Sequence, residues 1–207
     1  MIYATKPLSY LILDNIDLEN MELKEKNLEY TSFKKTNLKK ADLRKANLRK
    51  ANFDDANLEG ANLDGANLGH ANLRRASFKK ASLKGVNLVA ANLGTADFEA
   101  ANLEEIDLEG ANFAGNNLKR VNFVRNNFKG ANFEGANLEG ANIKATNLEE
   151  ANLKDAIFIG TDCEETNLTN VNFGWGANIG EGNLANINFS KVIFVPPKNA
   201  SFIDFMK

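Results

Sequence analysis

The chain repeats every five residues from Leu8 to Phe173 without one insertion or deletion. Among the 34 units counted from Leu8, the third position is Leu in 22 and Phe in 10. The residue two places earlier is usually Ala, and the residue between them is usually Asn. In an α-helix, residues five apart lie about 140° from one another, and in a straight strand an odd step changes the face. The period therefore requires the chain to turn a corner in every unit.

The first and third positions of a unit are two residues apart, so on a short extended segment their side chains point the same way. These positions are small-apolar and large-apolar, so we expect them to face inward, with Asn facing out and the fourth and fifth positions forming the corner. Many corners are Lys-Lys, Arg-Lys or Glu-Glu, which predicts that the corner does not demand a positive φ. Glycine would then be permitted rather than required at Gly60, Gly65, Gly110, Gly130 and Gly140.

The corner charges change sign every 20 residues. Residues 31–50 carry eight bases and one acid, residues 51–70 carry four acids and no Lys or Arg, and residues 71–90 carry five bases and no acid. This alternation predicts coils of four units in which each charge meets opposite charges about 4.8 Å away on the adjacent coils. One ladder would contain Glu19, Lys39, Glu59, Lys79, Glu99, Lys119 and Glu139. The same spacing predicts a core column of stacked rings formed by Phe33, Phe53, Phe113, Phe133 and Phe173.

The uninterrupted series Ala-Asn/Asp-Leu/Phe-X-X, as in residues 61–65 and 71–75, resembles the pentapeptide-repeat family over most of the chain. The resemblance implies an all-β fold, a right-handed quadrilateral β-helix with four units per coil. At this length we expect about nine stacked coils. The expected organisation is an N-terminal cap at residues 1–10, the β-helix at residues 11–195, and a C-terminal cap or tail at residues 196–207.

Composition indicates one soluble domain, with 43% hydrophobic and 25% charged residues in a chain of 207. The net charge of −2 gives no general attraction to nucleic acid or to an anionic membrane. The basic ring within residues 34–50 runs around the rod between acidic rings, which does not suit binding along a nucleic acid.

We find neither a membrane-spanning segment nor a signal peptide pattern, and one cysteine excludes an internal disulfide. A cytoplasmic protein is expected.

Few residues are candidates for chemistry. Cys163 stands at an inward third position, which indicates an inert buried thiol. His70 lies on a corner and Trp175 at a one-residue insertion, where local packing or a contact surface would explain it. Asn116 and Asn126 replace small inward residues on opposite faces, so we expect their amides to bond to interior backbone or to each other. The sequence offers no catalytic, cofactor-binding or metal-binding residue, and no cofactor is expected.

Two functions remain open, neither of them catalytic. The first is a rigid, monomeric module that presents flat faces to another protein, with an unknown partner and no nucleic acid or membrane. The second is implied by the family resemblance: some pentapeptide-repeat proteins mimic duplex DNA, bind DNA gyrase and confer quinolone resistance. That activity requires a largely acidic rod, usually dimerised through a C-terminal helix. Basic coils interrupt the acidic ones here and the tail is short, so we favour the interaction module.

Overall fold

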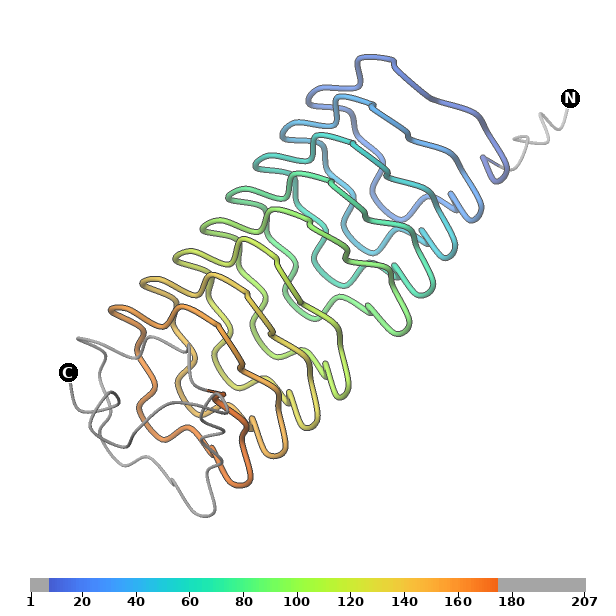
Figure 1. Cartoon of the computed structure of the whole chain (residues 1–207). Helices are drawn as coiled ribbons and strands as arrows, with labels where there is room; N and C mark the ends of the chain where they lie inside the picture. The colour runs from blue at the N-terminus through green and yellow to red at the C-terminus, as the bar shows by residue number, and fades with distance from the viewer. Residues whose placement is uncertain (1–7, 175–207) are drawn as a thin grey trace, which may run out of the picture.

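The structure is a computed structural model that describes residues 8–174 of the chain. These residues form an elongated rod of stacked coils (Figure 1). Parallel bridges join residues 20 apart, from Ile12↔Ser32 to Asn152↔Asn172, and the series is interrupted at two places. This register confirms the predicted coil of four units. The two expected caps and the total number of coils depend partly on residues 1–7 and 175–207, which lie outside the described residues.

Each unit contributes one bridging residue, at its second position, so the faces of the rod are made of isolated bridges rather than longer strands throughout residues 8–174. Two backbone hydrogen bonds accompany a bridge. For example, the Leu43 amide donates to the Asn62 carbonyl at 2.7 Å, and the Asn62 amide donates to the Ala41 carbonyl at 3.0 Å. In this part of the chain no helix is long and apolar enough to cross a membrane.

The corners share one backbone conformation, and the prediction that they do not need a positive φ is wrong. Every fifth-position residue from Tyr10 to Asn170 has a φ between 51° and 68°. The corner closes with a turn hydrogen bond, as from the Ala41 amide to the Leu38 carbonyl at 3.1 Å. A turn of this kind requires a left-handed residue at its third position. The stacked coil therefore imposes on lysine, arginine and glutamate a conformation that costs about 1–2 kcal/mol per residue.

The first and third positions of the units fill the interior, as expected. Phe33 stacks on Phe53 with ring centroids 4.9 Å apart, and Phe113 stacks on Phe133 at 5.2 Å. These two pairs confirm the predicted aromatic column. A second face holds a similar pair, formed by Phe78 and Phe98.

The asparagine at the second position has two roles that the sequence pattern did not indicate. Its side-chain Oδ1 accepts a hydrogen bond from the backbone amide two residues later, as Asn52 does from Asp54 at 3.1 Å, and so fixes the start of the corner. Its Nδ2 donates to the Oδ1 of the residue one coil earlier, as Asn72 does to Asn52 at 3.0 Å. The outward-facing amides therefore link the coils as well as shaping them, which explains why Asn is preferred over other polar residues.

Candidate functional site

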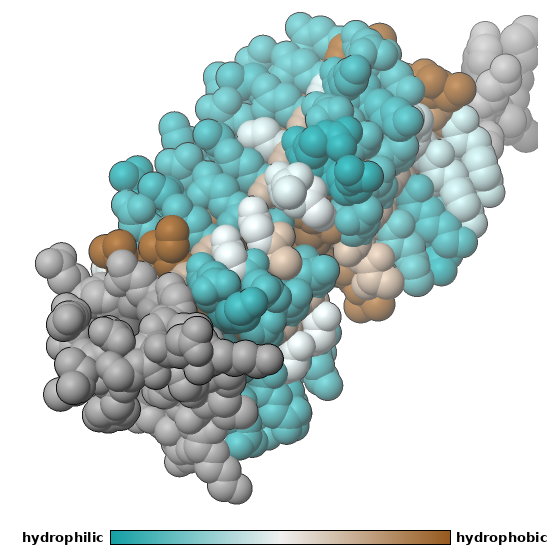
Figure 2. All heavy atoms as spheres, in the orientation of Figure 1, coloured by the Kyte–Doolittle hydropathy of each residue, from teal (hydrophilic) through white to brown (hydrophobic). Residues whose placement is uncertain are grey.

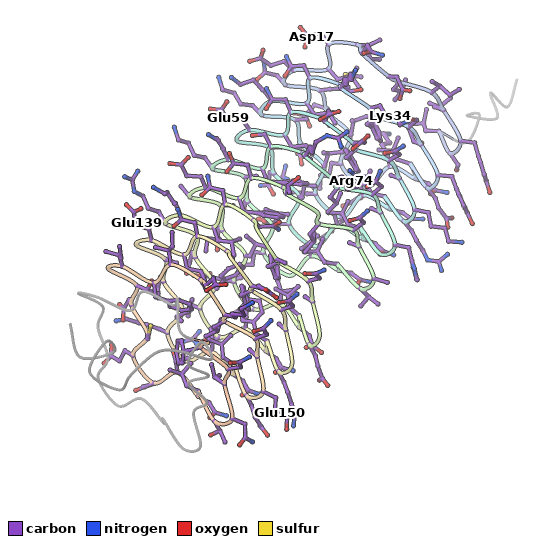
Figure 3. All side chains as sticks on the ribbon, viewed as in Figure 1. Asp17, Lys34, Glu59, Arg74, Glu139 and Glu150 are labelled. Atoms are coloured by element: carbon purple, nitrogen blue, oxygen red, sulfur yellow. The ribbon has the colours of Figure 1, made fainter. Side chains whose placement is uncertain are left out.

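The corner charges form ion pairs between adjacent coils. Three pairs of the predicted ladder have N–O distances of 2.7–3.4 Å: Lys39–Glu59, Lys79–Glu99 and Lys119–Glu139. Glu59 and Glu139 lie along one edge of the rod (Figure 3). Within the described residues, however, no ion pair joins Glu59 to Lys79 or Glu99 to Lys119, so the predicted ladder is not continuous. Glu99 instead pairs with Lys79 on one side and with Arg120 on the other, at 4.0 Å. Exposed pairs of this kind contribute roughly 0.2–1 kcal/mol.

The paired carboxyl groups are poor candidates for acid–base catalysis. The hydrogen bond from Lys39, together with its charge, lowers the pKa of Glu59. In the same way Arg75 lowers the pKa of Asp55, to which its Nε donates at 2.7 Å. A general acid at neutral pH needs a raised pKa. The surface acids with resolved shifts are therefore held ionised, as members of ion pairs.

The other residues that the sequence singled out do not form a reactive cluster. Cys163 is buried, and burial raises the pKa of its thiol to about 12, so it is not a reactive thiolate at neutral pH. His70 lies on an exposed corner, as predicted. Trp175 lies outside the described residues. Across residues 8–174, no three His, Cys, Asp or Glu side chains come together in a group that could hold a metal ion.

The two buried asparagines behave differently from each other. Asn126 accepts a hydrogen bond from the Ile106 amide at 2.8 Å and donates to the Leu103 carbonyl at 2.7 Å, which confirms the prediction of bonding to interior backbone. It thereby replaces the turn bond that other units make at this corner. Asn116 is only 1% exposed, yet its Oδ1 and Nδ2 have no hydrogen-bond partner. For Asn116 the prediction is wrong: at the corresponding corner the turn bond from the Ala96 amide to the Leu93 carbonyl, at 2.9 Å, is retained.

The stack of coils opens between residues 86–95 and residues 106–115, a region that we call the opening. The bridges that should join Asn87 to Asp107 and Asn92 to Asn112 are the two missing from the series, although the bridges on either side are formed. A cavity of about 370 Å³ lies there, lined by residues 88–93 and 107–112. Figure 1 shows the wider spacing on one side of the rod between the green and yellow-green turns. Asn116 directly follows the opening.

The opening leaves backbone hydrogen-bonding groups without partners. On its N-terminal side, the amides of Leu88, Ala90, Leu93 and Thr95 make none of the backbone bonds that the repeat would supply. On its C-terminal side the same holds for the amides of residues 107 and 112. One coil earlier, the Leu68 amide donates to the Asn87 carbonyl at 2.8 Å. Unsatisfied backbone groups are rare in folded proteins, and on a strand edge they form a template for pairing with another chain.

Bulky residues in one interior column provide a physical cause for the opening. Val86, Ile106 and Asn126 occupy the same first position on three successive coils, where Ala46 and Ala66 stand in the preceding coils. Adjacent coils are about 4.8 Å apart, which suits stacked methyl groups better than branched side chains. Isolated larger residues are accommodated, as at the buried Val121, which has Ala101 and Ala141 as its neighbours in the column. Thr146 and Thr166 continue the column on closed coils, so we attribute the opening to the stacking of the branched aliphatic Val86 on Ile106.

A crowded core in the next coil acts in the same direction. Residues 111–130 place three phenylalanines in one coil: Phe113, Phe123 and Phe128. Their rings meet edge to face, with centroids 4.8–5.9 Å apart. The preceding coil has only Phe98 among its third positions. The core therefore changes its filling at the level where the coils separate.

The opening also interrupts the pattern of surface charge. The sequence contains no Lys or Arg from Gly85 to Leu118. Asp97 and Glu99 pair with Lys79 on the preceding coil. In contrast, Asp107 and Glu109 have no ion pair within the described part of the chain. Both accept hydrogen bonds from Asn127, at 3.1 and 3.5 Å, and Asp107 also accepts one from the Glu109 backbone amide at 3.3 Å.

The facing N-terminal side of the opening supplies no base. It carries Val89, which is 64% exposed, and Ala90. Figure 2 shows white and tan surface across the middle of the rod between teal regions. The opening is therefore bordered by acids on one side and by small apolar side chains on the other.

Sequence reasoning missed the opening, although two signals for it were present. One is the run of Val86, Ile106 and Asn126 at a spacing of 20 residues. The other is the uncharged corners Val89-Ala90 and Gly94-Thr95, at positions where most other units carry a charge. Both signals are visible only after the coil length is known, because they concern residues that are adjacent in the stack and distant in the chain.

The family model for pentapeptide repeats matches the chain in eight copies, at residues 12–49, 51–89, 91–125, 106–144 and 136–174. The chain therefore belongs to the pentapeptide-repeat family. The family, with its solved members, implies that the coil is a right-handed quadrilateral β-helix. No curated protein matches the sequence.

Among solved structures, the chain is similar to HetL, a pentapeptide-repeat protein involved in heterocyst differentiation regulation in the cyanobacterium Nostoc sp. strain PCC 7120. The identity is 25%, the match covers 93% of this chain and 92% of HetL, and the TM-score is 0.74. A trypsin-treated form of QnrB1, a plasmid-mediated fluoroquinolone resistance protein, is 16% identical over 90% of both chains, with a TM-score of 0.47. The likeness to HetL extends over nearly the whole of both chains, whereas that to QnrB1 is too weak to carry an argument.

Proposed function

We propose that this chain is a non-enzymatic, rigid module that binds another protein. The observation that carries the proposal is the division between interior and surface. The inward positions are filled with Ala, Leu and Phe, while the second positions and corners repeat along each face at a fixed spacing of one coil. Outside the opening the described rod is filled and offers little to a small substrate, but its faces present side chains at regular intervals to a macromolecule.

The comparison with HetL supports the same conclusion. HetL is described as involved in heterocyst differentiation regulation, and a regulatory role is compatible with binding to another protein. The proposal includes a monomeric rod of about nine coils, acting in the cytoplasm, with neither nucleic acid nor a membrane as its partner. The net charge of −2 supports this part of the proposal, because such a rod lacks the electrostatic attraction that those partners require.

The alternative, a DNA mimic that binds gyrase, is disfavoured by the bands of charge. At physiological ionic strength the screening length is about 8 Å, so bands of opposite sign one coil apart largely cancel a short distance from the surface. A groove built for consecutive phosphates would meet the basic residues 34–50 and 74–84 as repulsive stripes.

The test is affinity capture with the purified chain from a lysate of its source cell, in the presence and absence of an excess of unlabelled folded chain. We expect one or a few proteins to be retained and then displaced by the competitor. Retention equal to that of a heat-denatured sample would contradict the proposal. A parallel gyrase supercoiling assay with and without quinolone, together with sedimentation of the chain, decides the alternative. Inhibition or drug protection at sub-micromolar protein, particularly from a dimer, would favour the DNA mimic.

A further inference from the structure

We infer that the opening is a binding site for a short, extended, basic segment of a partner protein, which adds its backbone to the unpaired edges of residues 86–95 and 106–115. The inference rests on the proposed function and assigns it a site and a class of partner. Edge strands recognise extended peptides through main-chain hydrogen bonds, and side-chain contacts then provide specificity. The opening contains the elements needed for both.

The backbone of the opening provides the first element. The amides of Leu88 and Leu93 on one side, and those of Asp107 and Asn112 on the other, lack the bonds that their counterparts make in closed coils. The carbonyls that would have accepted from residues 107 and 112, at Val86 and Ala91, lose those donors as well. An extended segment offers alternating donors and acceptors, and it can satisfy groups of both kinds.

The size and lining of the cavity indicate how much of a segment enters. The volume of about 370 Å³ corresponds to roughly twelve water molecules at about 30 Å³ each, so only a few residues fit inside. Small residues at the centre, Ala90, Ala91, Gly110 and Ala111, leave the backbone accessible. The segment therefore passes through the opening over a short length, with its remaining residues on the surface of the rod.

The charges around the opening select a basic segment. Asp107 and Glu109 border the C-terminal side without an ion pair among the described residues, although the charge of Lys129 on the following coil acts on Glu109. The chain has no Lys or Arg from residue 85 to residue 118. In closed coils an acid at such a position can pair with a base of the preceding coil, as Glu59 does with Lys39, but the coil before Glu109 has Val89 there. A Lys or Arg of the incoming segment takes that place, while exposed Val89 contacts its apolar side chains. An acidic segment would place like charges together, which opposes docking.

The experiment uses the full chain and a fluorescein-labelled peptide of eight residues that alternates valine with lysine, followed by fluorescence anisotropy. Two control peptides are matched to it: one has glutamate in place of lysine, and the other has alternate backbone amides N-methylated. We expect saturable binding of the lysine peptide and binding at least roughly tenfold weaker for each control, which corresponds to the loss of about 1.4 kcal/mol. Equal binding of the N-methylated peptide, or no binding of the lysine peptide at millimolar concentration, would overturn the inference.

Two variants locate the binding in the chain. Asp107→Asn with Glu109→Gln changes only surface groups, and we expect it to weaken binding of the lysine peptide severalfold. Its control, Glu150→Gln with Glu165→Gln, removes the same charge elsewhere on the rod and should leave binding unchanged.

The second variant, Val86→Ala with Ile106→Ala, removes the two branched side chains, and we expect it to close the opening and abolish binding. Binding that is unaffected by the first variant, or affected equally by its control, would contradict the site.

The outcomes distinguish this inference from the proposed function. If the chain retains a partner from its source cell, and the Val86→Ala, Ile106→Ala variant retains that partner equally well although its opening is closed, the module binds protein through another face and the inference fails alone. If no partner is retained by the unchanged chain, the proposed function fails. Self-association of the chain that the lysine peptide does not displace would assign the opening to a second copy and would also overturn the inference.

Discussion

The coils of residues 31–85 and the opening at residues 86–95 and 106–115 are built from the same five-residue unit, but only the former are closed on every face. In the closed coils each third-position amide donates to the next coil, as Leu63 does to Ser82 at 2.7 Å, whereas Leu88 and Leu93 make no such bond. Ion pairs such as Lys39–Glu59 also join the closed coils. Across the opening, within the described residues, no ion pair is formed. The repeat therefore specifies a coil, but stacking depends on what lies above and below each residue.

The difference between the two regions lies mainly in one column of the core. Ala46 and Ala66 are succeeded by Val86, Ile106 and Asn126. The three units that contain these larger residues otherwise keep the repeat, with Asn or Asp at the second position and Leu or Phe at the third. The column continues with Thr146 and Thr166 on closed coils, so the stacking of Val86 on Ile106 is the pairing that coincides with the missing bridge. A repeat protein can thus acquire unpaired backbone edges in the middle of its stack without an insertion in the chain.

Amide hydrogen exchange should give the largest contrast. Amides that are not bonded exchange through small local fluctuations, whereas those in closed coils require the coils to separate. We expect Leu88 and Leu93 to exchange at least about a hundredfold faster than Leu68 and Leu73, measured by NMR or by mass spectrometry of short peptides. Equal protection at these two pairs of sites would show that the opening is closed in solution. The variant Val86→Ala, Ile106→Ala should restore protection at Leu88 and Leu93.

Truncation of the core should give the next largest effect. Phe53 is fully buried between closed coils and stacks on Phe33, so Phe53→Ala is expected to lower the free energy of unfolding by about 3–5 kcal/mol. Leu108 lines the opening and lacks a closed coil on one side, so Leu108→Ala should cost about 2 kcal/mol, near the lower limit for buried leucine. The buried Leu63, on closed coils, provides the leucine control. Denaturant unfolding measures all three, and an equal loss for Leu63→Ala and Leu108→Ala would contradict the comparison.

Charge reversal should produce a smaller contrast between paired and unpaired acids. Glu59 pairs with Lys39, whereas Glu109 has no ion pair among the described residues. We expect Glu59→Lys to lower the melting temperature by a few degrees. Glu109→Lys should lower it less, because only the charge of Lys129, without an ion pair, acts on Glu109. High salt should reduce the difference, because it screens exposed charges. Equal melting temperatures for the two variants at low salt would show that the pairs contribute nothing to the stacking.

The smallest expected effect on the free energy of unfolding comes from backbone strain at Thr95, the last residue of the range 86–95. Thr95 has a φ of 55°, and it is the one β-branched residue among the described non-glycine residues with a positive φ. Thr95→Gly should therefore raise the free energy of unfolding by about 1 kcal/mol, since glycine adopts this conformation without a steric penalty. Asn20→Gly, on a closed coil, should give less, because Asn tolerates the left-handed region better. Thermal unfolding compares the two, and a destabilised Thr95→Gly chain would contradict the assignment of strain.

The sequence by itself determined the coil. Its period, its inward positions and the 20-residue alternation of charge follow from local geometry and from electrostatics between regularly spaced residues, and the structure confirms them in the stacking of Phe33 on Phe53 and in the bridges between residues 20 apart. Even the burial of Cys163 could be predicted, because its position within the unit fixes the direction of its side chain.

Only the tertiary structure decided the conformation of the corners and the location of the opening. The corner of Lys39-Lys40 gives no local sign of a positive φ, because lysine does not favour it and the stack imposes it. The opening depends on whether Val86 and Ile106 fit above one another within one coil spacing, and the buried amide of Asn116 has no hydrogen-bond partner. Such properties belong to contacts between residues 20 apart, and the free energy of those contacts depends on shape and packing that a five-residue pattern does not record.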